Sequence, residues 1–315
     1  MATFLLRRIL AALPVAFIVS ILAFLLMYFS PGDPAVHAAG GVDATEEGIR
    51  RAREYLGLND PMWVQYWKWL SGVLQGDFGT SFFRSTPVMD EIVQASAPTV
   101  SLAVVAMVMA VMTAIPLGFL AAIYRGSWLD RAITGYATIG IAAPSFFVGL
   151  LLVSIISLDW KLLPATGYVP FADNPIRWLQ HLILPGISLG LILSAELTRH
   201  FRSALLDVLS QDYVRTAIAK GLPTWKILLK HTAKNAAIPV VTVFGLQLRF
   251  ILGATVVIES VFALPGLGML MIRSAFNHDY RVLQAIAIVF VVTVLIINIL
   301  VDLSYAYFNP RVRSR

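Results

Sequence analysis

Cysteine is absent from this 315-residue chain, and charged residues make up only 13% of it. Without cysteine the chain has no disulfide framework, no thiolate metal ligand and no cysteine nucleophile. The five histidines are not spaced as metal ligands are. No Ser-His-Asp or paired-carboxylate site occurs, and no phosphate loop of the Gly-x-x-x-x-Gly-Lys-Ser/Thr type. We therefore predict no catalytic residue, no metal site and no cofactor within this chain.

Apolar residues dominate the composition. They make up 58% of the chain, and its mean hydropathy is +0.78, whereas roughly one quarter of the residues of a soluble domain are charged. The formal net charge of +6 comes from short segments between apolar runs rather than from one basic patch interleaved with aromatics. The composition therefore indicates a protein that crosses a membrane several times. Its basic residues indicate membrane topology and no nucleic-acid partner.

Several apolar segments are long enough to cross about 30 Å of hydrocarbon at about 1.5 Å per residue. The sequence thus predicts an all-α integral membrane protein with six transmembrane helices, at 9–29, 97–123, 133–156, 181–205, 236–258 and 282–308. The first run exceeds the core of a signal peptide, about 7 to 15 residues, so a cleaved signal is the weaker alternative for it.

These spans divide the chain into parts on either side of the membrane. We expect an N-terminal segment with the first transmembrane helix at 1–30, an extracytoplasmic helical loop at 31–96, a five-helix transmembrane core at 97–308 and a cytoplasmic tail at 309–315. The core would include a cytoplasmic loop at 206–235 and an extracytoplasmic loop at 259–281. Lys and Arg concentrate in the short segments that this arrangement places inside, which favours cytoplasmic N- and C-termini.

The loop at 31–96 carries helix signals of its own. Asp43 is placed to cap a first helix that Gly57 ends, and Pro61 begins a second helix. The second helix has an aromatic stripe at helical spacing, formed by Trp63, Tyr66 and Trp67. Packing against neighbouring helices is the favoured interpretation of the stripe, and a ligand platform is the alternative.

A polar segment at 211–239 separates two long apolar runs. Gly221 supplies the positive φ that ends one helix, and Pro223 begins the next, so two helices meet at a fixed elbow. The second helix is amphipathic, with Trp225 on one face and a lysine at every fourth position, Lys226, Lys230 and Lys234. A basic helix lying on anionic lipid is the alternative, but it does not account for the glycine elbow.

Two features within the membrane are candidates for a path through the protein. Arg249 lies near the middle of the fifth span, where a lipid-facing guanidinium costs at least about 2.5 to 3.5 kcal/mol. It therefore either lines a wet path or forms an ion pair with an acid or a partner subunit. The segment 259–268 is too apolar for a solvated loop and too rich in proline and glycine for a span, so it dips into the membrane or covers a pore mouth. Near the end of the fourth span, Glu196 is spaced to pair with Arg199.

Three sequence motifs follow one another along the chain. Residues 30–34 are Ser-Pro-Gly-Asp-Pro, Gly221 follows Ala217 by four residues at the elbow, and 259–268 contains Glu-x-Val-Phe-x-x-Pro-Gly-Leu-Gly. Together they resemble the permease subunits of ATP-binding-cassette importers, in the dipeptide and oligopeptide branch that includes nickel and glutathione permeases. Thr216 stands where the family's Glu-Ala-Ala loop has its glutamate. Residues 278–281 depart from the Arg-Asp-Tyr-Pro usual in this branch, so no role is carried onto His278 or Arg281.

The resemblance implies a cytoplasmic coupling helix that docks on a cassette ATPase. The coupling residues would be Arg215, Thr216, Ala217, Ala219, Lys220, Gly221, Leu222 and Trp225. The candidates for the translocation path are Arg249, Glu259, Phe262, Pro265 and Gly266. The implied partners are a second homologous permease subunit, two cassette ATPase subunits that bind ATP and Mg, an extracytoplasmic substrate-binding protein and the bilayer of a bacterial inner membrane.

The function implied is that of a non-catalytic permease subunit, forming half of a pathway for peptides or peptide-like solutes by alternating access. Nickel chelates, glutathione, opines and sugars are the alternative substrates. An ion-coupled secondary transporter is the rival class, but such proteins usually show internal repeats and acids near the midplane. This sequence has one intramembrane arginine and no evident repeat. A polytopic enzyme is a third, weaker alternative.

Overall fold

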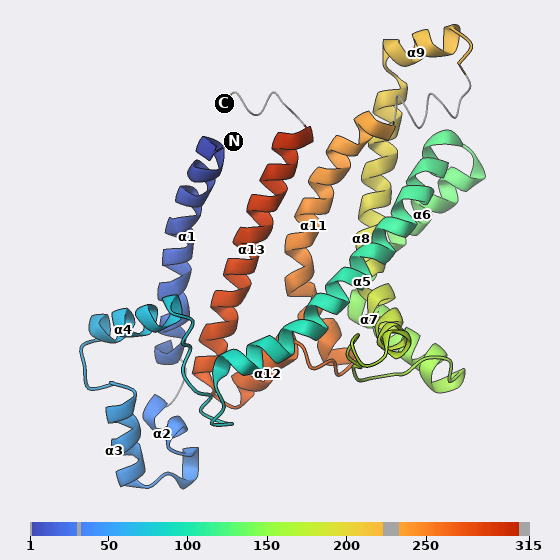
Figure 1. Cartoon of the computed structure of the whole chain (residues 1–315). Coiled ribbons are helices and arrows are strands. Elements are labelled where there is room, and N and C mark those ends of the chain that lie inside the picture. The colour runs from blue at the N-terminus through green and yellow to red at the C-terminus, as the bar shows by residue number, and fades with distance from the viewer. Residues whose placement is uncertain (1, 30–32, 223–232, 309–315) are drawn as a thin grey trace. The chain divides into compact units, whose positions relative to one another are not determined.

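The computed structural model describes residues 2–29, 33–222 and 233–308, and its regular structure is helical (Figure 1). Within these ranges five helices are long and apolar enough to cross a membrane, or six if one bent pair counts as a single span. No strand occurs in the described ranges beyond an isolated bridge between Thr80 and Pro87. The predicted all-α membrane fold is therefore confirmed.

The long helices follow the predicted spans, although their ends differ. They are α1 (Ala2–Phe29), α5 (Val88–Ile123), α8 (Pro175–Leu209), α11 (Ala233–Val261) and α13 (Tyr280–Phe308). Helix α8 begins before the predicted 181 because Asn174 caps it: Oδ1 of Asn174 accepts hydrogen bonds from Ile176 N and Arg177 N at 3.1 and 3.0 Å. A search for apolar runs misses such polar first turns.

The predicted third span at 133–156 is wrong as a single helix. Helix α6 (Trp128–Ala142) is followed by α7 (Ser145–Leu152) and the π-helical η2 (Val153–Asp159), and the two parts are bent by 102°. Pro144 lies at the break. It has no backbone N–H and excludes helical geometry at the preceding Ala143, whose ψ is 122°. The chain therefore forms a broken span or a re-entrant element here.

Short helices fill the predicted loops. They are α2 (Pro34–Ala38), η1 (Gly41–Asp43), α3 (Glu46–Tyr55), α4 (Met62–Leu74), α9 (Asp212–Ala219) and α12 (Leu267–Phe276). The predicted cap of the first loop helix is wrong by two positions. Thr45, rather than Asp43, caps α3, since Oγ1 of Thr45 accepts a hydrogen bond from Gly48 N at 3.1 Å while Asp43 ends η1. Gly57 follows the end of α3, as predicted, and has φ +67°.

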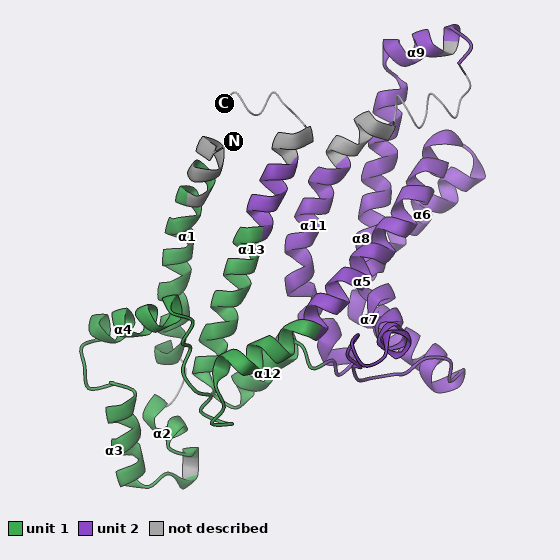
Figure 2. Cartoon of the chain, viewed as in Figure 1, with its two compact units in different colours: residues 1–97, 265–296 green, residues 98–264, 297–315 purple. Residues whose placement is uncertain are grey.

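The chain packs into two compact units (Figure 2). Unit 1 comprises Met1–Ala97 and Pro265–Ile296, and unit 2 comprises Pro98–Leu264 and Ile297–Arg315. The boundaries of these units differ from the divisions expected from the sequence. The expected divisions were drawn by the side of the membrane, whereas the units are defined by which residues pack together.

Unit 2 has its core between α5, α8 and α11. Leu102, Leu189 and Ile258 are fully buried there. Gly190 lets α8 approach α5 closely, since a Cβ on Gly190 would lie 3.0 Å from the carbonyl oxygen of Ala106. Small residues at such contacts are how membrane helices gain close packing without a hydrophobic driving force between them.

Unit 1 is held together around the start of α13. Val88, Val282 and Ile286 are fully buried in a cluster formed by α5, α12 and α13. The buried carboxylate of Asp279 accepts hydrogen bonds from Ser81 Oγ and from the backbone N–H groups of residues 82 and 83. This carboxylate ties the loop after α4 to the first turn of α13.

The aromatic stripe on α4 is divided between two environments within unit 1. Tyr66 is buried and its ring packs edge-on against Phe24 of α1 at a centroid distance of 5.5 Å. Trp63 and Trp67 of the same helix are 69% and 56% exposed. The predicted packing is therefore confirmed for Tyr66 and wrong for the two tryptophans within this chain.

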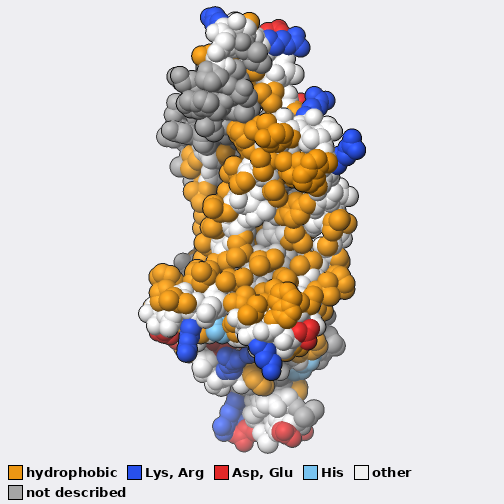
Figure 3. Space-filling model, turned by 90° about the vertical axis from the view of Figure 1, so that its right-hand side faces the viewer, with side chains coloured by type: hydrophobic (Ala, Val, Ile, Leu, Met, Phe, Trp, Pro, Cys, Tyr) orange, Lys and Arg blue, Asp and Glu red, His pale blue; other side chains and the backbone are white. Residues whose placement is uncertain are grey.

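Many large apolar side chains point outward from the long helices. Figure 3 shows them covering much of one face of the molecule, with Lys, Arg, Asp and Glu gathered away from them. Exposed examples in unit 2 are Val108 and Met112 on α5, Ile139 on α6 and Leu150 on α7. Such surfaces are stable against lipid and not against water, in agreement with a membrane protein.

Candidate functional site

Helix α9 presents most of its side chains outward, beside the end of α8. Val214 is fully buried and anchors the helix, whereas Arg215, Thr216 and Ala219 are exposed. The ion pair between Arg215 Nη1 and Asp212 Oδ1 is 3.6 Å long and exposed, so it contributes little to stability. Among the side chains of α9 that the structure describes, Val214 is the buried anchor, and the polar outer face is available to a partner.

The elbow after α9 has the predicted geometry. Gly221 has φ +73°, and Leu222 N donates to Ala217 O at 3.3 Å, which closes the last turn as a Schellman motif does. Lys220 and Leu222 are exposed on this turn. Trp225, together with Pro223, Lys226 and Lys230 of the predicted second helix, lies outside the described residues.

An ion pair that the sequence analysis missed joins α6 to α8. Nε and Nη2 of Arg202 donate to the two carboxylate oxygens of Asp130 at 2.6 and 2.8 Å, and Gly126 N donates to Oδ2 at 2.9 Å. Arg202 lies about two turns before the end of α8. The bidentate pair therefore holds the part of α8 that leads into α9 against α6.

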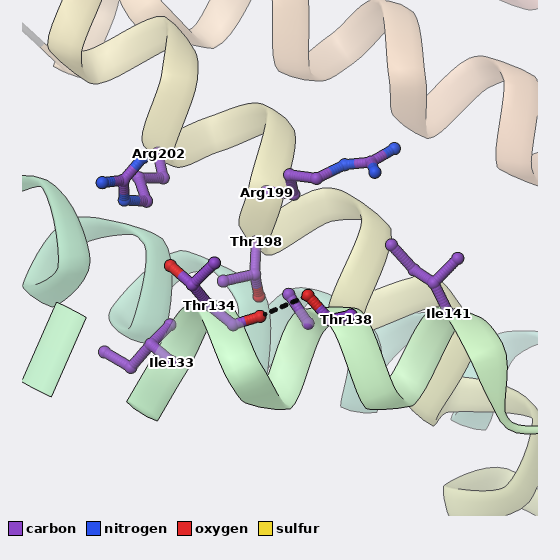
Figure 4. A pocket seen from close by; sticks show the side chains of 8 residues that line it. Ile133, Thr134, Thr138, Ile141, Thr198, Arg199 and Arg202 are labelled. Atoms are coloured by element: carbon purple, nitrogen blue, oxygen red, sulfur yellow. Dashed lines mark hydrogen bonds between the residues drawn. The ribbon is translucent and has the colours of Figure 1, made fainter. Parts of the chain in front are cut away.

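A cavity of about 150 Å³ lies beside this ion pair, between α6 and α8 (Figure 4). Thr134 and Thr138 of α6 line one side of it, and Thr198 of α8 lines the other. Arg199 also lines the cavity, and its side chain points away from Arg202 (Figure 4). The predicted ion pair between Glu196 and Arg199 is not formed among the described residues. Glu196 Oε2 instead lies 3.5 Å from Gln247 Nε2.

Arg249 lies on α11 with its side chain half-buried. Its Nε atom is buried and has no hydrogen-bond partner, and within the described part of the chain Arg249 forms no ion pair. Two positions earlier, Gln247 Nε2 donates to Leu193 O at 2.8 Å while its Oε1 is buried without a partner. The alternative of an ion pair with an acid in the described part of this chain is therefore excluded, whereas a path role and a pair with another subunit both stay open.

The end of α11 and the residues directly after it are anchored in unit 2. Glu259 is fully buried and accepts a hydrogen bond from Thr99 Oγ1 at 2.7 Å. Phe262 is 1% exposed, and its ring lies against Gly149 of α7, where a Cβ would come within 3.0 Å of it. The backbone oxygen of Phe262 accepts from Gly167 N at 3.1 Å. The side chains of Glu259 and Phe262 therefore hold this part of the chain in place.

The rest of this segment belongs to unit 1. Gly266 is buried and is the N-cap residue of α12, while Pro265 is exposed. The segment continues into the short helix α12, which the sequence analysis did not predict. It does not form another span among the described residues, as its proline and glycine content indicated.

Comparison with known proteins covers almost all of the chain. The family of binding-protein-dependent transport system inner membrane components matches residues 114–314, and the N-terminal membrane component of such systems matches residues 1–103. Over 315 residues the chain is 42% identical to the glutathione transport system permease proteins GsiC of Escherichia coli (strain K12) and Salmonella typhimurium (strain LT2). Each alignment covers 100% of this chain and 100% of its relative.

A solved structure shares the fold. Its chain comes from the MetNI methionine ABC transporter in an inward-facing conformation, with a TM-score of 0.58 and 16% identity over 70% of this chain and 97% of that chain. At this identity the similarity concerns the arrangement of the helices alone.

Proposed function

The chain belongs to the family of inner-membrane components of binding-protein-dependent transport systems and is a permease subunit of an ABC importer, and from this premise we propose that it forms half of a translocation pathway that operates by alternating access. A second homologous permease subunit forms the other half. Two cassette ATPase subunits bind ATP and Mg, and an extracytoplasmic binding protein delivers the solute. The observation that carries this proposal is the family match over residues 114–314, together with the 42% identity to GsiC over 315 residues.

We place ATPase docking on α9 and the elbow that follows it. The proposed contact residues are Arg215, Thr216, Ala217, Ala219, Lys220, Gly221, Leu222 and Trp225. The exposed face of α9 and the positive φ of Gly221 support this placement. Because Val214 anchors α9 and Asp130 ties α8 to α6, a displacement of α9 moves α8 and α6 together.

We propose that Arg249 lines the translocation path. Arg249 is half-buried and has no carboxylate partner in the part of the chain that the structure describes, which supports this, because an arginine in a membrane span needs water, a counter-charge or a solute. Glu259, Phe262, Pro265 and Gly266 shape the segment at the external end of the path. The burial of Glu259 and Phe262 supports a role in positioning that segment rather than in touching the solute.

The proposed solute is peptide-like. The two relatives above are named for glutathione transport, and a guanidinium in the path suits a solute with a carboxylate. A ligand screen on the binding protein that serves this importer tests the assignment. Binding of peptides or glutathione supports it, whereas binding of nickel chelates, sugars or opines alone contradicts it.

The proposed location is a bacterial inner membrane, with the N- and C-termini and the α9 elbow on the cytoplasmic side. The distribution of Lys and Arg supports this orientation, and it places the elbow where ATP is available.

Reconstitution tests the transport mechanism. Proteoliposomes that contain this chain with its partner subunits are expected to take up solute only when ATP and the binding protein are both present. Uptake by this chain alone, driven by an ion gradient, would identify it as a secondary transporter.

A further inference from the structure

A second polar cavity, of about 520 Å³, lies entirely within unit 1. Small-molecule pockets commonly have volumes of about 300 to 1,000 Å³. Apolar side chains of α1 and α4, among them Phe24 and Trp69, form part of its lining. Charged side chains of α3, α4, α13 and the loops on either side of α4 also line it, together with uncharged polar side chains such as Gln65. None of the proposed coupling or path residues lines this cavity.

Arg281 supplies a positive charge to the cavity and is held between two aromatic rings. Its guanidinium carbon lies 5.4 Å from the ring centroid of Tyr55 and 5.3 Å from that of Phe82. The Tyr55 hydroxyl interacts with this guanidinium, which lowers the pKa of Tyr55. Cation–π contacts of this kind orient a guanidinium without using its N–H donors.

The backbone beside Arg281 is shaped to admit the guanidinium. Gly79 has φ +75°, and a Cβ there would lie 2.7 Å from Arg281 Nη1. The hydrogen bond from Arg281 Nη1 to Thr80 Oγ1 is long, at 3.5 Å. Among the described residues no carboxylate pairs with Arg281. Since a guanidinium has five N–H donors, most of them are available to a ligand.

The acidic side chains of the cavity are not equivalent. Asp60 is paired with Lys68 at 2.7 Å, and Asp77 Oδ1 accepts a hydrogen bond from Gly79 N at 2.8 Å. Glu54 is exposed, and its carboxylate has no hydrogen bond or ion pair within the described ranges. Among the described residues the cavity therefore has one cation without a carboxylate partner, Arg281, and two carboxylates without an ion pair, Glu54 and Asp77, of which only Asp77 accepts a backbone hydrogen bond with its side chain.

We infer that this cavity binds a small zwitterion, whose carboxylate is held by the guanidinium of Arg281 and whose ammonium group faces Glu54. A carboxylate matches the planar fork of a guanidinium with two parallel hydrogen bonds. An acidic side chain of a docked binding protein is the competing occupant, but it would leave Glu54 without a counter-charge. A free dipeptide supplies both charges and fits the volume.

This inference goes beyond transport, because it gives the permease a ligand site of its own, apart from its coupling and path residues. In the proposed orientation the site opens on the extracytoplasmic side. The choice of a dipeptide as the probe rests on the proposed function.

Calorimetric titration of the full importer complex in nanodiscs, without the binding protein, tests this inference. L-alanyl-L-alanine is expected to bind, and its N-acetylated, C-amidated form is not. Arg281→Gln is expected to weaken dipeptide binding by about tenfold or more, because the carboxylate loses its charge-assisted hydrogen bonds to the guanidinium. Glu54→Gln is expected to weaken it as well. Arg51→Gln, on the same helix α3 as Glu54 but outside the cavity lining, is the matched control and is expected to leave binding unchanged.

The inference would be overturned if the complex bound no dipeptide at millimolar concentrations, or if the Arg281→Gln complex bound the dipeptide as tightly as the unmodified complex. It would also be overturned if Arg281→Gln changed only the affinity of the complex for the binding protein. If Arg281→Gln does not assemble, Gly79→Ala displaces the same guanidinium and serves in its place. ATP-driven uptake without dipeptide binding would refute the site and leave the transport function standing. Dipeptide binding without ATP-driven uptake would support the site and contradict the proposed transport function.

Discussion

At the scale of single residues, Asp130 is important because its carboxylate accepts three hydrogen bonds, from Nε and Nη2 of Arg202 and from Gly126 N. Its carboxylate is buried, at 7% side-chain exposure, while the Arg202 side chain is 28% exposed. Removal of the carboxylate leaves a guanidinium and a backbone N–H without their acceptor. Buried donors that lose an acceptor carry a larger penalty than the net value of the bond itself.

We therefore expect Asp130→Ala to lower the free energy of unfolding by about 1–3 kcal/mol. Thermal unfolding of the purified chain in detergent measures this effect. Arg215→Ala is the matched control, since its ion pair with Asp212 is 3.6 Å long and exposed. Arg215→Ala is expected to change the free energy of unfolding by no more than about 0.5 kcal/mol. Equal midpoints for Asp130→Ala and the unmodified chain would contradict the role of the pair.

Arg249 gives the second prediction at this scale. Arg249→Met is expected to reduce ATP-driven uptake by about tenfold or more, because the solute loses the equivalent of one charge-assisted hydrogen bond, about 1.5–3 kcal/mol. The ATPase and permease subunits are still expected to copurify. Arg131→Met, at an exposed position of α6, is the control. Loss of the assembled complex would instead show that Arg249 pairs with another subunit.

At the scale of elements, the elbow after α9 depends on one dihedral angle. Gly221 has φ +73°, and no atom of the described residues lies within 4 Å of a Cβ built on it. Steric exclusion by the described neighbours is therefore not what requires glycine there. Glycine is required there because of the left-handed conformation, which costs an L-residue about 1–2 kcal/mol and a β-branched residue more.

Gly221→Val is accordingly expected to leave membrane insertion intact and to uncouple ATP hydrolysis from transport. The ratio of solute taken up to ATP hydrolysed, measured in proteoliposomes, reports this directly. Gly135→Val is the control, because Gly135 of α6 also has open space at its Cβ but no positive φ. An unchanged coupling ratio in Gly221→Val would remove the elbow from the mechanism.

At the scale of the whole molecule, the absence of cysteine allows membrane topology to be tested with single introduced thiols. Lys220→Cys, on the elbow, is expected to react with a membrane-impermeant maleimide only in inverted vesicles. Glu54→Cys, on α3, is expected to react only in right-side-out vesicles. Both positions are exposed in this chain, so that in vesicles without the ATPase subunits their accessibility depends on the side of the membrane. Reaction of Lys220→Cys from outside would contradict the proposed orientation.

The sequence by itself determined the features that depend on neighbouring residues. Helices of membrane-spanning length follow from uninterrupted apolar runs, and the positive φ at Gly57 and Gly221 follows from the turn each residue must make. The family assignment was also within reach, because its motifs are short strings such as the one at 259–268. Each of these signals is complete within a few tens of residues.

Only the tertiary structure decided which distant residues meet. Asp130 and Arg202 are 72 positions apart, and Asp279 and Ser81 are 198 apart, so no local pattern marks either pair. The same holds for the burial of Glu259 beside Thr99, and for the exposure of Trp63 on a helix whose Tyr66 is buried. Burial and pairing depend on which faces pack against each other, and a periodic sequence marks a face as apolar without naming its neighbour.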